Sequence, residues 1–172
     1  MTRGLALLAL VGCLSALTVG DHDLPDRVQI DGRELSLRGG GTLRWKGLLA
    51  IYDAGLWTGP AGERRLEFRY RRSISASDLA EATRSTIGRG LTSEQRARLT
   101  PALERLCALY RDVREHDALV FTALLGIGTL VEMHGKLIDT IPGDDFADAL
   151  FAIWLGPDPV DRRFRTALLG NP

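Results

Sequence analysis

The residue types that most often carry chemistry in proteins stand apart from one another along this chain. His22 lies between two aspartates, His116 beside another, and His134 in a segment typical of a turn. A metal site needs several ligands that converge, so we interpret these histidines as solvated loop residues and predict no metal site. Cys107 follows Leu106 on an apolar stripe and is interpreted as a small core residue rather than a nucleophile.

Motifs for nucleotide and acyl chemistry are also missing. The sequence contains no Gly-x-Ser-x-Gly elbow, no Gly-Lys-Ser/Thr phosphate loop and no Cys-x-x-Cys pair. Gly126-Ile127-Gly128 lacks the third glycine of a dinucleotide-binding turn and fits a connection between strands better. The sequence therefore predicts no catalytic residue of these classes and no cofactor.

One arginine-rich segment raises the question of an anion site. Charged and apolar residues alternate there, with Leu66, Phe68 and Tyr70 set between Arg65, Glu67, Arg69 and Arg71. This period of two is typical of a half-buried strand. Its arginines form either a polyanion site or, more commonly, a solvated strand face. The whole chain carries 22 basic and 22 acidic residues, so its net charge does not favour nucleic acid or an anionic membrane.

The strands expected to position these residues fall into two groups. Alternation and turn residues predict strands over 28–30, 35–37, 42–57, 66–70, 118–125, 129–133 and 136–141. We expect Gly39-Gly40-Gly41 to interrupt the first group. At 172 residues, with 45% hydrophobic and 26% charged residues, the chain has the composition of one globular domain with one core.

Helices are expected between and after these strand groups. Ser75 caps a helix that Gly88 ends, and Thr92 with Gln95 forms a capping box for the next helix. Pro101 is expected to kink or restart that second helix. Two further helices are expected after Pro142 and after Pro159. The grouping of elements predicts an α+β fold, an antiparallel sheet with a layer of helices on one face.

The first twenty residues have a different character. Arg3 precedes an uncharged run, Gly4 to Val19, which is typical of a secretory signal peptide. We therefore expect a signal peptide over residues 1–20, a mature domain over 21–172, and a periplasmic or otherwise exported protein. Leu10-Val11-Gly12-Cys13 offers an alternative, a lipobox whose acylated Cys13 would anchor the protein in the envelope. Without Cys13, a single cysteine remains and no internal disulfide is expected.

Two segments of the sequence are specific enough to indicate a family. The first runs from Gly41-Thr42-Leu43-Arg44-Trp45-Lys46 to Ile51-Tyr52-Asp53-Ala54-Gly55-Leu56-Trp57. The second comprises Gly135-Lys136, Ile141-Pro142-Gly143-Asp144-Asp145-Phe146 and Ala152-Ile153-Trp154-Leu155-Gly156. Both resemble the chalcone isomerase-like family of exported bacterial proteins, and the resemblance covers roughly residues 28–170. It implies an open-faced sandwich with a ligand cleft between sheet and helices. It also relates the chain to plant members that bind fatty acids.

The resemblance also implies a polar end for that cleft. Arg44 falls on the arginine that meets the anionic end of the ligand in the family, and Tyr52 falls near a hydroxyl-bearing position of the same cleft. In a straight strand these two residues would share a face but lie roughly 26 Å apart. They converge only if the chain folds back near Lys46-Gly47, where a glycine permits a turn or bulge.

Three further positions differ from the plant enzymes that close the flavanone ring. Leu79, Thr86 and Ile153 stand where those enzymes carry a tyrosine, an asparagine and a threonine. The resemblance therefore implies ligand-binding walls at these positions rather than isomerase chemistry. We expect a monomeric, non-catalytic binder of a fatty acid or similar small hydrophobic acid. The alternatives are an intramolecular lyase acting on chalcone-like polyphenols, and a structural envelope protein without a small ligand.

Overall fold

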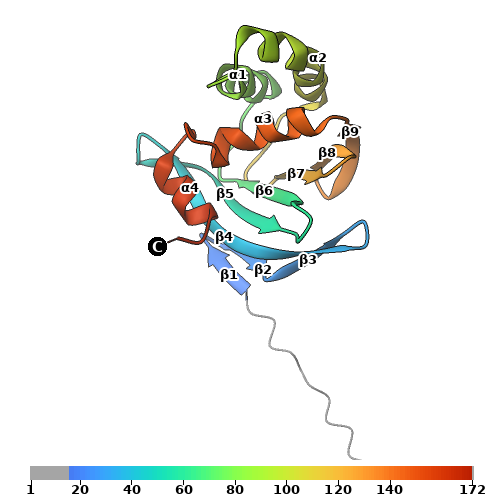
Figure 1. Cartoon of the computed structure of the whole chain (residues 1–172). Helices are drawn as coiled ribbons and strands as arrows, with labels where there is room; N and C mark the ends of the chain where they lie inside the picture. Colours follow the sequence, from blue (N-terminus) through green and yellow to red (C-terminus); the bar gives the residue numbers. More distant parts are fainter. Residues whose placement is uncertain (1–15, 172) are drawn as a thin grey trace, which may run out of the picture.

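Seven strands follow one another across a single antiparallel sheet in their chain order (Figure 1). The strands are β3 (Arg27–Ile30), β4 (Arg33–Trp45), β5 (Leu49–Thr58), β6 (Arg64–Tyr70), β7 (Ala118–Leu124), β8 (Gly128–Met133) and β9 (Lys136–Ile141). This computed structural model describes residues 16–171. Because every neighbouring pair is antiparallel, the two predicted strand groups form one meander, joined where β6 pairs with β7.

Four helices cover one face of this sheet (Figure 1). They are α1 (Ala76–Ile87), α2 (Ser93–Leu109), α3 (Asp144–Leu155) and α4 (Arg162–Leu168). Helix α3 packs on β7 and β8, α1 and α2 pack on α3, and α4 packs on β4. This arrangement confirms the predicted α+β class. Among the described residues, no helix is long and apolar enough to cross a membrane.

Local signals in the sequence account for the helix starts. The Ser75 hydroxyl accepts a hydrogen bond from the Asp78 N–H, and Thr92 and Gln95 form the expected reciprocal capping box. Of the two outcomes expected at Pro101, a kink or a restart, the restart is wrong, because α2 runs through the proline as one helix. Leu99 and Leu106 are buried on either side of the proline. Their packing on the core offsets the backbone hydrogen bond that proline cannot make.

The expected interruption at Gly39-Gly40-Gly41 is also wrong, since β4 continues through it with a register shift between Leu37 and Gly39. A Cβ atom at Gly41 would lie 2.9 Å from the Cβ of Ala167 in α4. A Cβ atom at Gly40 would lie 2.5 Å from Cδ1 of Leu24 on the other side of the sheet. The glycines therefore let two layers approach the same strand closely.

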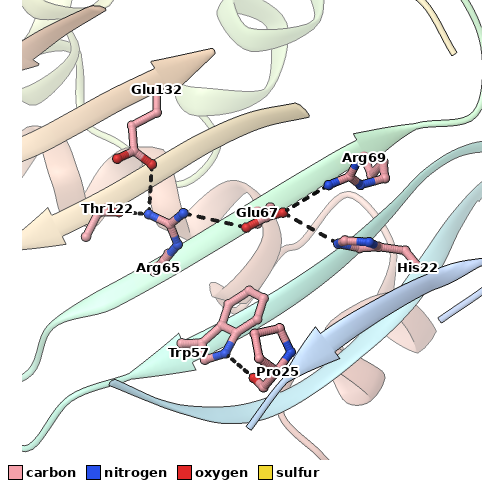
Figure 2. Close-up of polar contacts among 8 residues, drawn as sticks. All are labelled: His22, Pro25, Trp57, Arg65, Glu67, Arg69, Thr122 and Glu132. Carbon is pink, nitrogen blue, oxygen red and sulfur yellow. Dashed lines mark hydrogen bonds and ion pairs between the residues drawn. The ribbon is translucent and has the colours of Figure 1, made fainter. Parts of the chain in front are cut away.

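The second of these layers is a short hairpin, β1 (Ala16–Val19) and β2 (His22–Pro25), whose strands form a separate two-stranded sheet. It covers part of the face opposite the helices (Figure 1), and Val19 and Leu24 form a buried cluster with Leu35 and Trp57. The indole N–H of Trp57 donates to the Pro25 carbonyl at 2.8 Å (Figure 2). Residues 16–19 thus pack with the domain although they fall in the expected signal peptide. Residues 1–15 of that segment, Cys13 included, lie outside the described residues.

Carboxylates accompany the arginines of β6 on this outer face. Figure 2 shows Arg65 donating to Glu132 at 2.8 Å and pairing with Glu67 at 3.5 Å. Glu67 also lies 3.6 Å from Arg69 and 3.5 Å from His22. The side chain of Arg65 is only 11% exposed. Because Arg65 and Arg69 each lie beside a carboxylate, the β6 arginines on this face belong to an ion-pair network and do not form a free cationic surface.

Candidate ligand cavity

A cavity of about 210 Å³ lies between the sheet and the helices. Its walls are mostly apolar, with aliphatic side chains from both layers that include Leu43, Ile51, Leu79, Leu119, Ile153 and Val160. Aromatic rings form one continuous part of the wall. Tyr52 contacts Phe68 edge to face with 5.1 Å between ring centroids, and Phe68 contacts Trp154 at 4.7 Å. Such rigid, well-packed walls are typical of a preformed ligand pocket.

Four of the five predicted site residues line this one cavity. Tyr52 comes from β5, Leu79 and Thr86 from α1, and Ile153 from α3. The Thr86 hydroxyl donates to the Ala82 carbonyl at 2.6 Å. Its proton is therefore already engaged within α1. Only the tertiary fold brings these residues together.

Arg44 lies elsewhere. The chain does fold back as required, with Lys46 (φ 50°) and Gly47 (φ 71°) in the left-handed turn between β4 and β5. A register shift after Leu43 places Leu43 opposite Tyr52 and turns Arg44 toward Ala50. Leu43 therefore lines the cavity, whereas Arg44 is exposed and lines a separate groove beside α4.

Three phenol hydroxyls lie in the cavity wall, of which the sequence predicted only Tyr52. The Trp154 indole donates to the Tyr52 hydroxyl at 2.9 Å. Tyr110 lies 2.9 Å from the Thr83 hydroxyl, which itself donates to the Leu79 carbonyl, so Tyr110 is the donor of that pair. The hydroxyls of Tyr52 and Tyr70 donate to no other described residue. Two phenol protons are thus free for a ligand.

Burial makes ionisation of these phenols still less favourable than it is in water. Desolvation raises the pKa of Tyr52, Tyr70 and Tyr110 well above the usual value for tyrosine, because a phenolate would lose its hydration. For Tyr70, the neighbouring Tyr52 and Tyr110 raise the pKa further. At physiological pH the phenols therefore act as neutral hydrogen-bond donors. The signal for Tyr70 was its place in the alternation of β6, which predicts a buried side chain but not a cavity.

The cavity contains little charge. Among the described residues that line it, Asp78 alone is charged, and it is an exposed residue whose carboxylate accepts from the Ser75 hydroxyl at 2.7 Å. Within residues 16–171, no cation lines the cavity. A carboxylate held inside would therefore meet hydrogen-bond donors without a charge partner, which favours a neutral polar group at that position.

Comparison with known proteins agrees with this architecture. A model of the chalcone isomerase-like family matches residues 16–170. No curated protein matches the chain by sequence. The crystal structure of a fatty-acid binding protein from Arabidopsis thaliana superposes with a TM-score of 0.74 over 91% of this chain and 96% of that chain, at 12% sequence identity. At this identity the likeness shows the fold alone. Since the family model spans nearly the whole described domain, the chain belongs to the chalcone isomerase-like family.

Proposed function

We propose that this protein binds a small hydrophobic molecule in the cavity, with a short- or medium-chain fatty acid as the first candidate, and does not transform it. The observation that carries the proposal is an apolar cavity that offers two free phenol donors, Tyr52 and Tyr70. The similarity in fold to a plant fatty-acid binding protein supports the same class of ligand.

The size of the cavity limits the ligand. At about 210 Å³ it is smaller than the roughly 300–1,000 Å³ of typical pockets for drug-sized ligands. An acyl chain would pack among the aliphatic and aromatic walls, and its polar end would accept hydrogen bonds from the phenols. Leu79, Thr86 and Ile153 supply ligand contacts but no titratable group for acid–base catalysis.

A direct test is extraction of the purified protein with organic solvent, followed by mass spectrometry. We expect a bound fatty acid, or a neutral molecule of similar size, at close to one equivalent. Leu79→Trp would fill the cavity from α1 and should leave the extract empty. Leu137→Trp, on an exposed position of β9, is the matched control and should retain the ligand. Failure of the parent protein to bind octanoic acid or its methyl ester in a titration would exclude the proposal.

We further propose that the protein is exported, on the evidence of the apolar segment that follows Arg3. The packing of β1 supports a cleavage site before Ala16 over one near Asp21, because the later site would remove Val19 from its buried cluster. Cleavage at the lipobox, directly before Cys13, would also keep Val19 in the mature chain. The resulting location is the cell envelope.

A further inference from the structure

The turn between β4 and β5 displays large apolar side chains. Leu48 is 86% exposed, Trp45 59% and Leu49 44%. The turn projects from the sheet beside α4 (Figure 1). A cluster of apolar side chains exposed to water usually marks an interaction site, whereas single exposed apolar residues are common on any protein surface.

Positive charge surrounds this turn. Arg44 lines the groove between the turn and α4 together with Arg162 and Arg163, and Lys46 Nζ lies 4.5 Å from the centroid of the Trp45 ring. Among the described residues none of these four cations has a carboxylate within 4 Å. Asp161, the acidic residue of the groove, accepts the Phe164 N–H at 2.7 Å as a helix cap. The arginines of β6, in contrast, are all paired.

We propose that the docking tip, defined as Arg44–Leu49 with Arg162 and Arg163 of α4, binds the surface of an anionic lipid bilayer. Tryptophan prefers the boundary between headgroups and acyl chains, and the two leucines would enter the acyl region. The four cations would lie at the level of the phosphates, where each basic residue contributes about 1 kcal/mol, or about fivefold in partitioning. The proposal does not depend on the ligand proposed for the cavity.

Charge favours a membrane over a second copy of this chain. A symmetric contact through the docking tip would bring the same unpaired cations face to face, which is unfavourable. The turn between β7 and β8 provides an internal comparison. Leu125 and Ile127 are 71% and 40% exposed there, but the charged neighbour is Asp144, which accepts the Gly126 N–H at 3.0 Å. That turn is apolar without being cationic, so it serves as a matched control.

The docking tip is adjacent to the cavity. Leu43, which lines the cavity, directly precedes Arg44. Phe164 lines the groove and contacts Tyr52 of the cavity wall with 5.8 Å between ring centroids. One aromatic side chain thus lies between the membrane-facing groove and the cavity. A bilayer docked on this face would lie next to the proposed binding site.

Trp45 reports on docking directly. Trp57 is fully buried and Trp154 partly buried, whereas Trp45 is 59% exposed. The full-length protein is mixed with vesicles of brominated phosphatidylcholine, either pure or containing phosphatidylglycerol. We expect a blue shift and bromine quenching with the anionic vesicles, weakened by added salt, and loss of both signals in Trp45→Phe.

Substitutions of exposed residues test which side chains contact the bilayer. Neutralising Arg162 or Arg163 to Gln should raise the lipid concentration for half-maximal quenching about fivefold for each residue. Leu48→Ser should raise it about tenfold because the serine no longer buries apolar area. Leu125→Ser should leave it within about twofold of the parent. All these side chains are exposed, so the variants should fold normally.

Three results would overturn the proposal. One is equal quenching by the pure phosphatidylcholine vesicles, since it would remove the role of charge. Another is vesicle binding without quenching of Trp45, which would assign binding to another part of the chain. The third is self-association of the protein that Leu48→Ser abolishes, because the docking tip would then contact a second copy.

Discussion

At the scale of residues, the cavity combines apolar walls with neutral donors. Tyr52 accepts from Trp154 and retains its own proton, and Tyr70 retains its proton as well. Arg44, the only cation that the family resemblance assigns to the ligand, is separated from them by the register shift after Leu43. Two hypotheses about the polar end of the ligand therefore make opposite predictions.

If the phenols hold the ligand, a neutral carboxyl group should bind better than a carboxylate. We expect the affinity for octanoic acid to rise as the pH falls from 7 toward the pKa of the acid, since the protonated form then becomes available. The methyl ester should bind with an affinity that does not change over this range. Titration calorimetry at constant salt measures both.

The Arg44→Ala variant separates the hypotheses further. With the phenols as donors, its affinity should match the parent, while Tyr70→Phe should cost about 0.5–1.5 kcal/mol, the usual contribution of one hydrogen bond. If Arg44 swings in to pair with a carboxylate, its removal should cost about 2–5 kcal/mol. The ester should then bind more weakly than the acid, and the phenol hypothesis would be wrong.

At the scale of elements, close approach across β4 joins the layers of the molecule. Gly40 faces Leu24 and Val19 of the β1–β2 hairpin, and Gly41 faces Ala167 of α4. A second contact, a bidentate ion pair, joins α2 to β9, where Arg105 donates to both carboxylate oxygens of Asp139 at 2.7 Å. Each contact joins segments that are distant in the sequence.

Gly40→Val tests the first of these contacts. Even a Cβ atom would lie 2.5 Å from Leu24 Cδ1 and 2.9 Å from the Ala54 carbonyl oxygen, so the hairpin must shift. We expect a loss of about 1–3 kcal/mol in the free energy of unfolding, the range for an overpacked core. Ser36→Val, at an exposed position of the same strand, should change it by no more than about 0.5 kcal/mol. Equal denaturation midpoints for Gly40→Val and the parent would contradict this account.

Asp139→Asn tests the second contact through its pH dependence. Hydrogen bonds from Arg105 hold the pKa of the Asp139 carboxyl below its usual 3.8. Its stabilising contribution is therefore complete above that value and is lost as the pH falls through the lower pKa of the folded state. We expect Asp139→Asn to lower the melting temperature at pH 7, and to lower it less as the pH falls below 3.8. Asp158→Asn, at an exposed carboxylate without a partner among the described residues, should have no effect over the same pH range.

At the scale of the whole molecule, the hairpin β1–β2 raises the question of where the domain begins. Val19 is 8% exposed in its cluster, and the family match starts at residue 16. Residues 16–19 are also the last four residues of the apolar segment, Gly4 to Val19, that predicts export.

A chain that starts at Asp21 should be less stable than one that starts at Ala16. It loses the pairing of β1 with β2 and the burial of Val19, which by itself contributes about 1.5–3 kcal/mol. Urea unfolding of the two proteins measures the difference, and N-terminal sequencing of the protein from its native envelope locates the cleavage. A native start at Asp21 together with unchanged stability would show that β1 is dispensable.

The sequence alone predicts most of the fold because the relevant signals are local. The caps at Ser75 and Thr92 and the alternation from Leu66 to Tyr70 each depend on neighbours a few residues away. Local signals predicted an interruption at Gly39-Gly40-Gly41, where β4 continues, and allowed a restart at Pro101, where α2 continues. There, contacts with distant segments outweigh the local preference for a break.

The family resemblance located Tyr52, Leu79, Thr86 and Ile153, which the structure collects around one cavity. Composition and periodicity could not do so, because these positions are up to about a hundred residues apart. The place of Arg44 depends on a one-residue register shift, and a shift of one residue turns a strand side chain to the opposite face. The docking tip likewise follows from the meeting of α4 with the turn after β4, since a balanced total charge does not reveal where the unpaired cations gather. Local order was thus determined by the sequence pattern, whereas the polar end of the cavity and the cationic surface were decided by tertiary packing.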